Sequence, residues 1–199
     1  VKYFLGEAQA AAALLHRNLV TVFDAGEQDD DYYLAMEFIH GQTLKELITE
    51  AGPFQEQLVR FIAVQACRGL AYAHQKGIAH RDIKSSNMML TSDKSLKIMD
   101  FGLAKFIEQF QGAHTKAVGT PIYMSPEQIM GVSVDHRADL YSLGVTLFEC
   151  ATGSTPFFKG DLTYHHLHTA APNPRSLNPI LSEEMDRIIL KLLEKKPND

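Results

Sequence analysis

The stretch that decides the fold of this chain is His80-Arg81-Asp82-Ile83-Lys84-Ser85-Ser86-Asn87, residues 80–87. It is followed by Asp100-Phe101-Gly102 at 100–102 and by Ser125-Pro126-Glu127 at 125–127. Each string alone is short enough to recur by chance. The three strings in this order are very unlikely to be accidental, so we treat them as one signature.

The residues between the first two strings predict a β-hairpin. Met88–Leu90 and Leu96–Met99 are short apolar runs, and the turn-forming residues Thr91–Lys94 separate them. Such a hairpin places Asp82 and Asp100 at neighbouring strand ends. Both carboxylates can then point into one cleft.

Together the strings match the H-R-D-x-x-x-x-N and D-F-G motifs of protein kinases. From about Phe4 to the last residue, the chain resembles a serine/threonine protein kinase catalytic domain of the bacterial, eukaryote-like type. The resemblance implies an α+β, two-lobe fold. Residues 1–39 would form a partial small lobe and hinge, with one helix and two to three strands, and residues 40–199 the helical large lobe.

The resemblance also implies phosphoryl transfer from ATP with Mg²⁺, a reaction that needs alignment and charge neutralisation more than covalent chemistry. Asp82 would orient the hydroxyl group of a protein substrate, and Lys84 would stabilise the transferring phosphate. Asn87 and Asp100 would ligate Mg²⁺, which prefers carboxylate, amide and phosphate oxygens. Lys84, two positions after Asp82, favours Ser/Thr over Tyr as the acceptor.

Further positions are implied to bind the nucleotide or to regulate the site. Met36 would lie beside the adenine, and the backbone from Glu37 to Ile39 would bind its edge. The nucleotide-binding set that the resemblance implies is Glu7, Met36, Glu37, Ile39, Met89 and Asp100.

The segment Leu103–Glu127 corresponds to an activation segment. Within it, Thr120 would dock the peptide substrate. Arg81 places a cation beside this segment, and a phosphate on Thr115 could order the segment through charge-assisted hydrogen bonds.

Helical patterns occupy five further stretches: Phe4–Leu15, Thr43 to about Gly52, Gln57–Gln75, Asp139–Ala151 and Ser182–Lys195. Thr43-Leu44-Lys45-Glu46 is a capping box. Asp139–Ala151 is nearly all apolar, which predicts a buried helix, and the resemblance implies that Asp139 braces the backbone around His80 and Arg81. Two strands are expected at Thr21–Ala25 and Tyr32–Phe38, joined by an acidic turn at Glu27–Asp31.

Composition is ordinary for a globular protein: 199 residues, 45% hydrophobic and 22% charged, with a formal net charge of −5. It offers no basic patch for nucleic acid, so the expected partners are protein substrates. Cys67 and Cys150 predict buried free thiols and a reducing, cytoplasmic compartment for the domain; a membrane anchor elsewhere in a longer protein stays open. For His165, His166 and His168 a surface helix is favoured over a metal site, because no carboxylate or cysteine is close in sequence.

The chain departs from the family pattern at both ends. It contains no G-x-G-x-x-G string, only Val1–Gly6 precede Glu7, and Lys2 is too close to Glu7 to lie on a separate strand. The chain also stops before the arginine that would pair with Glu127. We therefore expect residues 1–199 alone to bind ATP weakly at most and to be inactive, although the parent protein is active.

Two alternatives stay open at this point. A pseudokinase or binding module could keep the large lobe without the chemistry, but decay usually erases Asp82, Asn87 or Asp100 first, and all three are present. A small-molecule phosphotransferase with a kinase-like fold would lack an activation segment that ends in a Pro-Glu pair.

Overall fold

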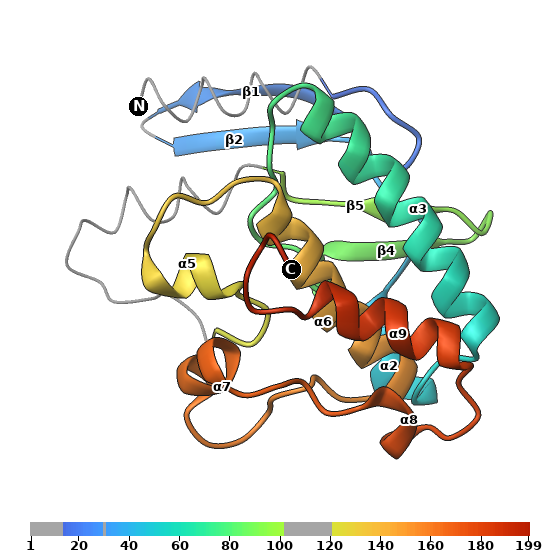
Figure 1. The fold of residues 1–199 in the computed structure, drawn as a ribbon. Coiled ribbons are helices and arrows are strands. Elements are labelled where there is room, and N and C mark those ends of the chain that lie inside the picture. The colour runs from blue at the N-terminus through green and yellow to red at the C-terminus, as the bar shows by residue number, and fades with distance from the viewer. Residues whose placement is uncertain (1–13, 30, 102–120) are drawn as a thin grey trace.

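The computed structural model describes residues 14–29, 31–101 and 121–199 (Figure 1). Residues 4–13 of the predicted helix at Phe4–Leu15, with Glu7, and the greater part of the activation segment, with Thr115 and Thr120, lie outside these residues; Leu14 and Leu15 are described and are not helical. The described elements, in chain order, are β1 (Val22–Gln28), β2 (Asp31–Met36), β3 (Gly41–Thr43), α2 (Leu44–Ala51), α3 (Glu56–Gln75), a 3₁₀ turn (Ser85–Asn87), β4 (Met88–Thr91), β5 (Leu96–Ile98), α5 (Pro126–Met130), α6 (Arg137–Thr152), α7 (Leu162–His168), α8 (Pro174–Leu177) and α9 (Glu183–Leu192). This α+β organisation confirms the expected fold class.

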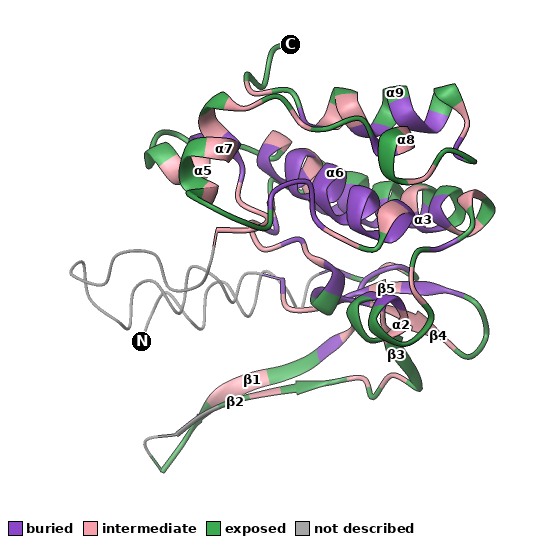
Figure 2. Cartoon of the chain, turned by 90° about the horizontal axis from the view of Figure 1, so that it is seen from below, coloured by how far each residue is buried: buried purple, intermediate pink, exposed green. Residues whose placement is uncertain are grey.

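Helix α6 forms the centre of the helical part. Every residue from Tyr141 to Ala151 is buried, as the all-round apolar pattern predicted. Figure 2 shows the buried helix α6 beside α3, which is buried on one face only, with α9 on one side and α2 with the short strands on the other. Helices α6 and α9 approach closely at Gly144, where an added Cβ would lie 2.7 Å from Leu192 Cβ. A glycine is therefore required at this crossing.

The strands form two small antiparallel sheets, β1-β2 and β3-β4-β5. The predicted hairpin around the turn at Thr91–Lys94 is confirmed, with Met88 opposite Ile98 and Leu90 opposite Leu96. The two sheets are linked through the segment before β1, where Val20 N donates to Ile98 O at 2.9 Å and Ile98 N donates to Asn18 O at 2.9 Å. The hairpin β4-β5, which leads into the Asp-Phe-Gly string, is thereby fixed to the segment before β1.

The hairpin β1-β2 differs from the sequence prediction in its bounds. Its pairing continues to Gln28 opposite Asp31, so the acidic residues extend the strands instead of forming a broad turn. Asp29 begins the turn with φ +52°. Aspartate tolerates this left-handed conformation better than most residues, so it can begin a short turn.

Helix α2 begins as the capping box predicted. The Thr43 side chain accepts from Glu46 N at 3.1 Å, and the Glu46 side chain accepts from Thr43 N at 2.8 Å. The helix ends at Ala51, and Gly52 follows with φ +77°. The two reciprocal bonds satisfy amide groups that a helix start otherwise leaves without partners.

Replacing Thr43 by alanine is expected to lower the free energy of unfolding by about 1 kcal/mol, because the cap for Glu46 N is lost. Thr49→Ala is the matched control: Thr49 lies on the same helix, is exposed, and donates only to Lys45 O. Urea unfolding of both variants, followed by far-UV circular dichroism, measures the difference. A Thr43→Ala variant as stable as Thr49→Ala would contradict the capping assignment.

One sequence prediction about side-chain exposure, the burial of Cys67, is wrong. Cys67 is exposed, because it falls on the solvent side of α3, whereas Cys150 is buried in α6; both are free thiols. The histidine run does form helix α7, but His166 is fully buried and its Nδ1 lies 2.9 Å from the Tyr141 hydroxyl oxygen. Within the described ranges, no group of three or more His, Cys, Asp or Glu side chains could hold a metal ion.

Of the helices described, none combines the length and the apolar character needed to cross a membrane.

Candidate active site

The backbone of the loop at 80–87 is held by hydrogen bonds to a buried carboxylate. Asp139, in the first turn of α6, is 0% exposed and accepts from His80 N at 2.8 Å and from Arg81 N at 2.7 Å. His74, at the end of α3, places Nε2 2.8 Å from the same carboxylate. The prediction that Asp139 braces this backbone is confirmed, and His74 contacts the same carboxylate. A buried carboxylate needs such partners to offset its desolvation.

Each of the two motifs contains one residue other than glycine with a positive φ. Arg81 has φ +68° and Asp100 has φ +62°, both in the left-handed region. This conformation is costly for a side chain as large as arginine and persists only where surrounding contacts fix it. At Arg81, Asp139 holds the amide and Gln128 Nε2 donates to the carbonyl oxygen at 2.9 Å.

Gln128 is a site residue that the sequence reasoning missed. It is the fourth residue of a second capping box, in which Ser125 caps α5 and Gln128 returns a bond to Ser125 N at 3.0 Å. The pattern Ser-x-x-Gln before a helix was visible in the sequence. The second bond of Gln128, to the carbonyl oxygen of Arg81, depends on tertiary structure and was not visible in the sequence.

His80 connects the two motifs. Its Nδ1 accepts from Asp82 N at 3.2 Å, so the proton must be on Nε2, which donates to Met99 O at 2.7 Å. The ring also packs edge-on against Phe101, with centroids 4.4 Å apart. His80 is 1% exposed. The loop that bears Asp82 and the strand end that bears Asp100 are thus tied together by one neutral imidazole.

The carboxylate of Asp82 has two side-chain partners from its own loop. Lys84 Nζ donates to Oδ2 at 2.7 Å and Asn87 Nδ2 donates to the same oxygen at 3.0 Å. Asn87 Nδ2 also donates to Asp82 O at 2.9 Å. In the described part of the chain these side-chain bonds use Oδ2 only, which leaves Oδ1 to accept from a ligand. The Asp82 side chain is 38% exposed, so a ligand can reach it.

The structure brings Met36 and Asp100 to one hollow. This hollow, part of it open to solvent, is otherwise lined by the apolar residues Leu14, Leu19, Val20, Val22, Leu34 and Phe101. Among the described residues that line it, Asp100 is the only charged one. A ligand that entered this hollow would contact the Asp100 carboxylate beside apolar side chains.

The segment after β2 is fixed by an ion pair that the sequence did not indicate. Lys97 Nζ lies 2.6 Å from Glu37 Oε1, which also accepts from Thr21 N at 2.7 Å. Glu37 N donates to Thr21 O at 2.9 Å. Of the backbone groups of Glu37, the carbonyl is therefore the one left for a ligand. Hydrogen bonding to Lys97 and to Thr21 outweighs the opposing effect of burial and lowers the pKa of the Glu37 carboxyl.

Met89 and Ile39 are both half-buried, Met89 in β4 opposite Thr43 and Lys97, and Ile39 just before β3. Glu7, Thr115 and Thr120 lie outside the described residues. The structure thus brings together Asp82, Lys84, Asn87 and, through His80, the strand end at Asp100.

Comparison with known proteins agrees with this arrangement. Residues 2–199 match the family described as protein kinase domain. The chain is 39% identical over 202 residues to the serine/threonine-protein kinase PrkC of Bacillus subtilis, covering 99% of this chain and 31% of that protein. It is 38% identical over 207 residues to PknB of Mycobacterium tuberculosis, covering 98% and 33%. A probable serine/threonine-protein kinase of Clostridium perfringens is 39% identical over 202 residues, covering 99% and 29%.

The chain therefore spans about a third of the length of these relatives. The match to the family runs through both motifs and through the helices that hold them. On these grounds the chain belongs to the protein kinase domain family.

Proposed function

We propose that this chain is the catalytic part of a serine/threonine protein kinase, which transfers the γ-phosphate of ATP to Ser or Thr hydroxyls of protein substrates. The observation that carries the proposal is the arrangement at Asp82. Its carboxylate is bonded to Lys84 and Asn87, and its loop is held in a strained conformation by the buried Asp139. Strain that is held this firmly is typical of functional sites.

In the reaction, Asp82 accepts a hydrogen bond from the substrate hydroxyl and orients its oxygen for in-line attack on the γ-phosphorus. The phosphorus–oxygen bond to the β-phosphate breaks as the new one forms, and ADP leaves. The hydroxyl proton goes to the solvent or to Asp82. Lys84, whose Nζ lies 2.7 Å from Asp82 Oδ2, would stabilise the charge on the transferring phosphate.

The donor groups fit Mg²⁺ in the form in which nucleotides carry it. Asp100 offers a carboxylate and Asn87 an amide oxygen, since Asn87 Nδ2 is already turned toward Asp82. Two protein oxygens are what such sites supply, with phosphates and water completing the octahedron. When bound, Mg²⁺ would neutralise charge on the phosphate oxygens. Met36, the Glu37 carbonyl, Ile39 and Met89 would hold the adenine.

The remaining assignments are part of the same proposal. Residues 1–39 would be the partial small lobe with Glu7, and residues 40–199 the large lobe. Thr120 would dock the peptide substrate.

Arg81 and Thr115 would form the regulatory pair. Arg81 Nε is buried and has no hydrogen-bond partner within the described residues, so it could donate to a phosphate on Thr115. Phosphopeptide mapping of the active full-length protein should find phosphate on Thr115. Phosphate at other positions of the segment, and never at Thr115, would reject this assignment.

The class of acceptor is tested by supplying γ-labelled ATP and Mg²⁺ to the full-length protein with a mixture of protein acceptors and aminoglycoside antibiotics. We expect label on Ser and Thr of protein. Label on the antibiotics alone would favour a small-molecule phosphotransferase. ATP binding without any transfer would favour a pseudokinase or binding module.

A further inference from the structure

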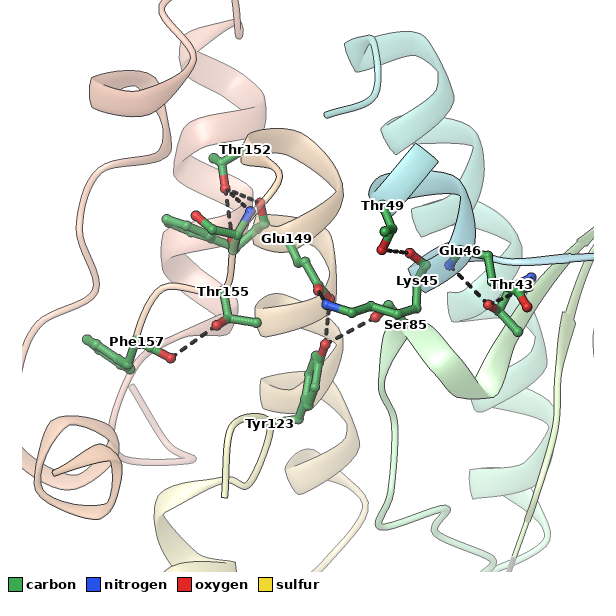
Figure 3. Close-up of polar contacts among 12 residues, drawn as sticks. Thr43, Lys45, Glu46, Thr49, Ser85, Tyr123, Glu149, Thr152, Thr155 and Phe157 are labelled. Atoms are coloured by element: carbon green, nitrogen blue, oxygen red, sulfur yellow. Dashed lines mark hydrogen bonds and ion pairs between the residues drawn. The ribbon is translucent and has the colours of Figure 1, made fainter. Parts of the chain in front are cut away.

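An ion pair joins α2 to the last turn of α6, across 104 positions of sequence. Lys45 Nζ lies 2.8 Å from Glu149 Oε1 (Figure 3). The two ends of the pair differ sharply in exposure: the Glu149 side chain is 1% exposed, whereas the Lys45 side chain is 55% exposed. The carboxylate is thus sealed inside the protein, and the ammonium group covers it on the solvent side.

The second oxygen of Glu149 is also occupied. The Tyr123 hydroxyl donates to Glu149 Oε2 at 2.5 Å, and Ser85 Oγ lies 3.1 Å from the same hydroxyl. Because the Tyr123 proton points to Glu149, the Ser85 hydroxyl must donate to Tyr123. Burial, together with the charge of Glu149, raises the pKa of Tyr123, so this hydroxyl stays a donor. Both carboxylate oxygens therefore have partners.

This network borders the site of phosphoryl transfer. Ser85 belongs to the same loop as Asp82 and Lys84. Tyr123 precedes the start of α5, and its carbonyl oxygen accepts from Ser142 Oγ at 2.7 Å. Figure 3 shows Lys45 reaching from α2 toward Glu149, with Tyr123 and Ser85 meeting beside the contact. Helix α2 also packs against the 3₁₀ turn at Ser85–Asn87, so Lys45 lies on a helix that borders the loop bearing Asp82.

The position of Lys45 opposes a general preference. It lies in the first turn of α2, where the helix dipole disfavours a cation. The contact with Glu149 offsets this cost, but it uses only one of the three donors of the ammonium group. An anion that approached from solvent could accept from the remaining donors of the ammonium group. A basic side chain would meet an exposed cation, and the carboxylate behind it is already bonded twice.

We infer that Lys45 is a specificity-determining residue, which binds an anionic side chain of the protein substrate and disfavours a basic one. The inference rests on the proposed kinase function, because it concerns the peptide that this function would bring to the site. The anion is a carboxylate or a phosphate, since either can accept from an ammonium group. Glu149 and Tyr123 act as positioning residues that hold Lys45 in place.

The test uses the full-length protein and peptides that share one acceptor serine. Single Glu, phosphoserine, Ala or Lys residues are placed in turn at each position flanking that serine. For wild type, we expect one position at which an anionic residue raises kcat/KM about fivefold or more over Ala. Glu and phosphoserine show which anion is preferred. In Lys45→Met this preference is lost, and in Lys45→Arg it is retained.

Lys76→Met is the matched control for loss of one positive charge. Lys76 is exposed at the far end of α3, a helix of 20 residues whose start adjoins α2 (Figure 1). In Lys76→Met, the ratio of kcat/KM for the acidic peptide to kcat/KM for the alanine peptide should equal that of wild type. A purely structural role for Lys45 would lower turnover of all peptides together and leave the ratio unchanged, which would overturn the inference.

Equilibrium binding of the same peptides, measured by fluorescence anisotropy, separates this inference from the proposed function. A protein that transfers no phosphate but binds the anionic peptide more tightly, in a manner dependent on Lys45, would contradict the kinase function alone. Transfer that proceeds with equal efficiency on anionic, neutral and basic peptides would overturn the role of Lys45 alone. Equal binding of all peptides by a protein that transfers nothing would overturn both.

Discussion

Asp82→Ala in the full-length protein is expected to lower kcat for phosphoryl transfer about a thousandfold, with the fold retained. The carboxylate is the group placed to orient the attacking hydroxyl, and no other described side chain of the loop could replace its oxygen. The side chain is partly exposed and its partners are the polar groups Lys84 and Asn87, so its removal leaves no cavity in the core. Initial rates with saturating ATP and a protein acceptor measure the effect.

Ser86→Ala is the control for this substitution, because Ser86 lies on the same loop and is exposed. Its kcat should stay within about twofold of wild type. Circular dichroism spectra and unfolding midpoints of both variants should match wild type. Near-normal turnover by Asp82→Ala would show that the carboxylate of another residue serves as the base.

Asp139→Ala is expected to destabilise the protein by about 3 kcal/mol or more and to abolish transfer. The substitution leaves the buried amides of His80 and Arg81 without an acceptor, and it frees His74. The strained φ of +68° at Arg81 is then held only by the bond from Gln128 Nε2 to the Arg81 carbonyl oxygen, among the bonds described above. Urea unfolding of the variant measures the stability, and transfer assays below the unfolding transition measure the activity.

Asp139→Asn separates charge from hydrogen bonding. The amide keeps one oxygen that can accept from a loop amide but presents an NH₂ group to the other. We expect a loss of stability smaller than that of Asp139→Ala. An Asp139→Ala variant less than about 1 kcal/mol below wild type would mean that the loop does not depend on this carboxylate.

Local signals predicted the elements of the site well. The capping box at Thr43, the hairpin around Thr91–Lys94 and the all-apolar helix α6 each depend on residues within one or two turns of each other. The brace from Asp139 required more, because it spans 58 and 59 positions. It was predictable only because the motifs identified the family.

Pairs between distant segments could not be predicted from the sequence in this way. Lys45 and Glu149, and likewise Lys97 and Glu37, are 104 and 60 positions apart. The apolar pattern of α6 indicates that Glu149 is buried, but no local pattern identifies which distant residue pairs with it, or that Lys97 pairs with Glu37. Burial of Cys67 was predicted wrongly for a related reason: the apolar pattern of α3 is broad, and its exact buried face is set by the contact with α6 and β5.

The alternative of a binding module is distinguished by what happens to the nucleotide. A module that kept the fold without the chemistry would still hold Asp139 against the loop, so structure and stability alone do not separate the two functions. The bonding of Asp82 to Lys84 and Asn87 has a direct use only in transfer to a hydroxyl. Measurement of the products is therefore decisive.

The most direct test is the ratio of protein-bound phosphate to ADP formed by the full-length protein with labelled ATP, Mg²⁺ and a protein acceptor. Phosphoamino-acid analysis identifies the modified residue. The proposed mechanism predicts about one phosphoserine or phosphothreonine for each ADP, because the hydroxyl oriented by Asp82 replaces water as the attacking group. ADP without protein phosphate, or ATP bound and returned unchanged, would contradict it.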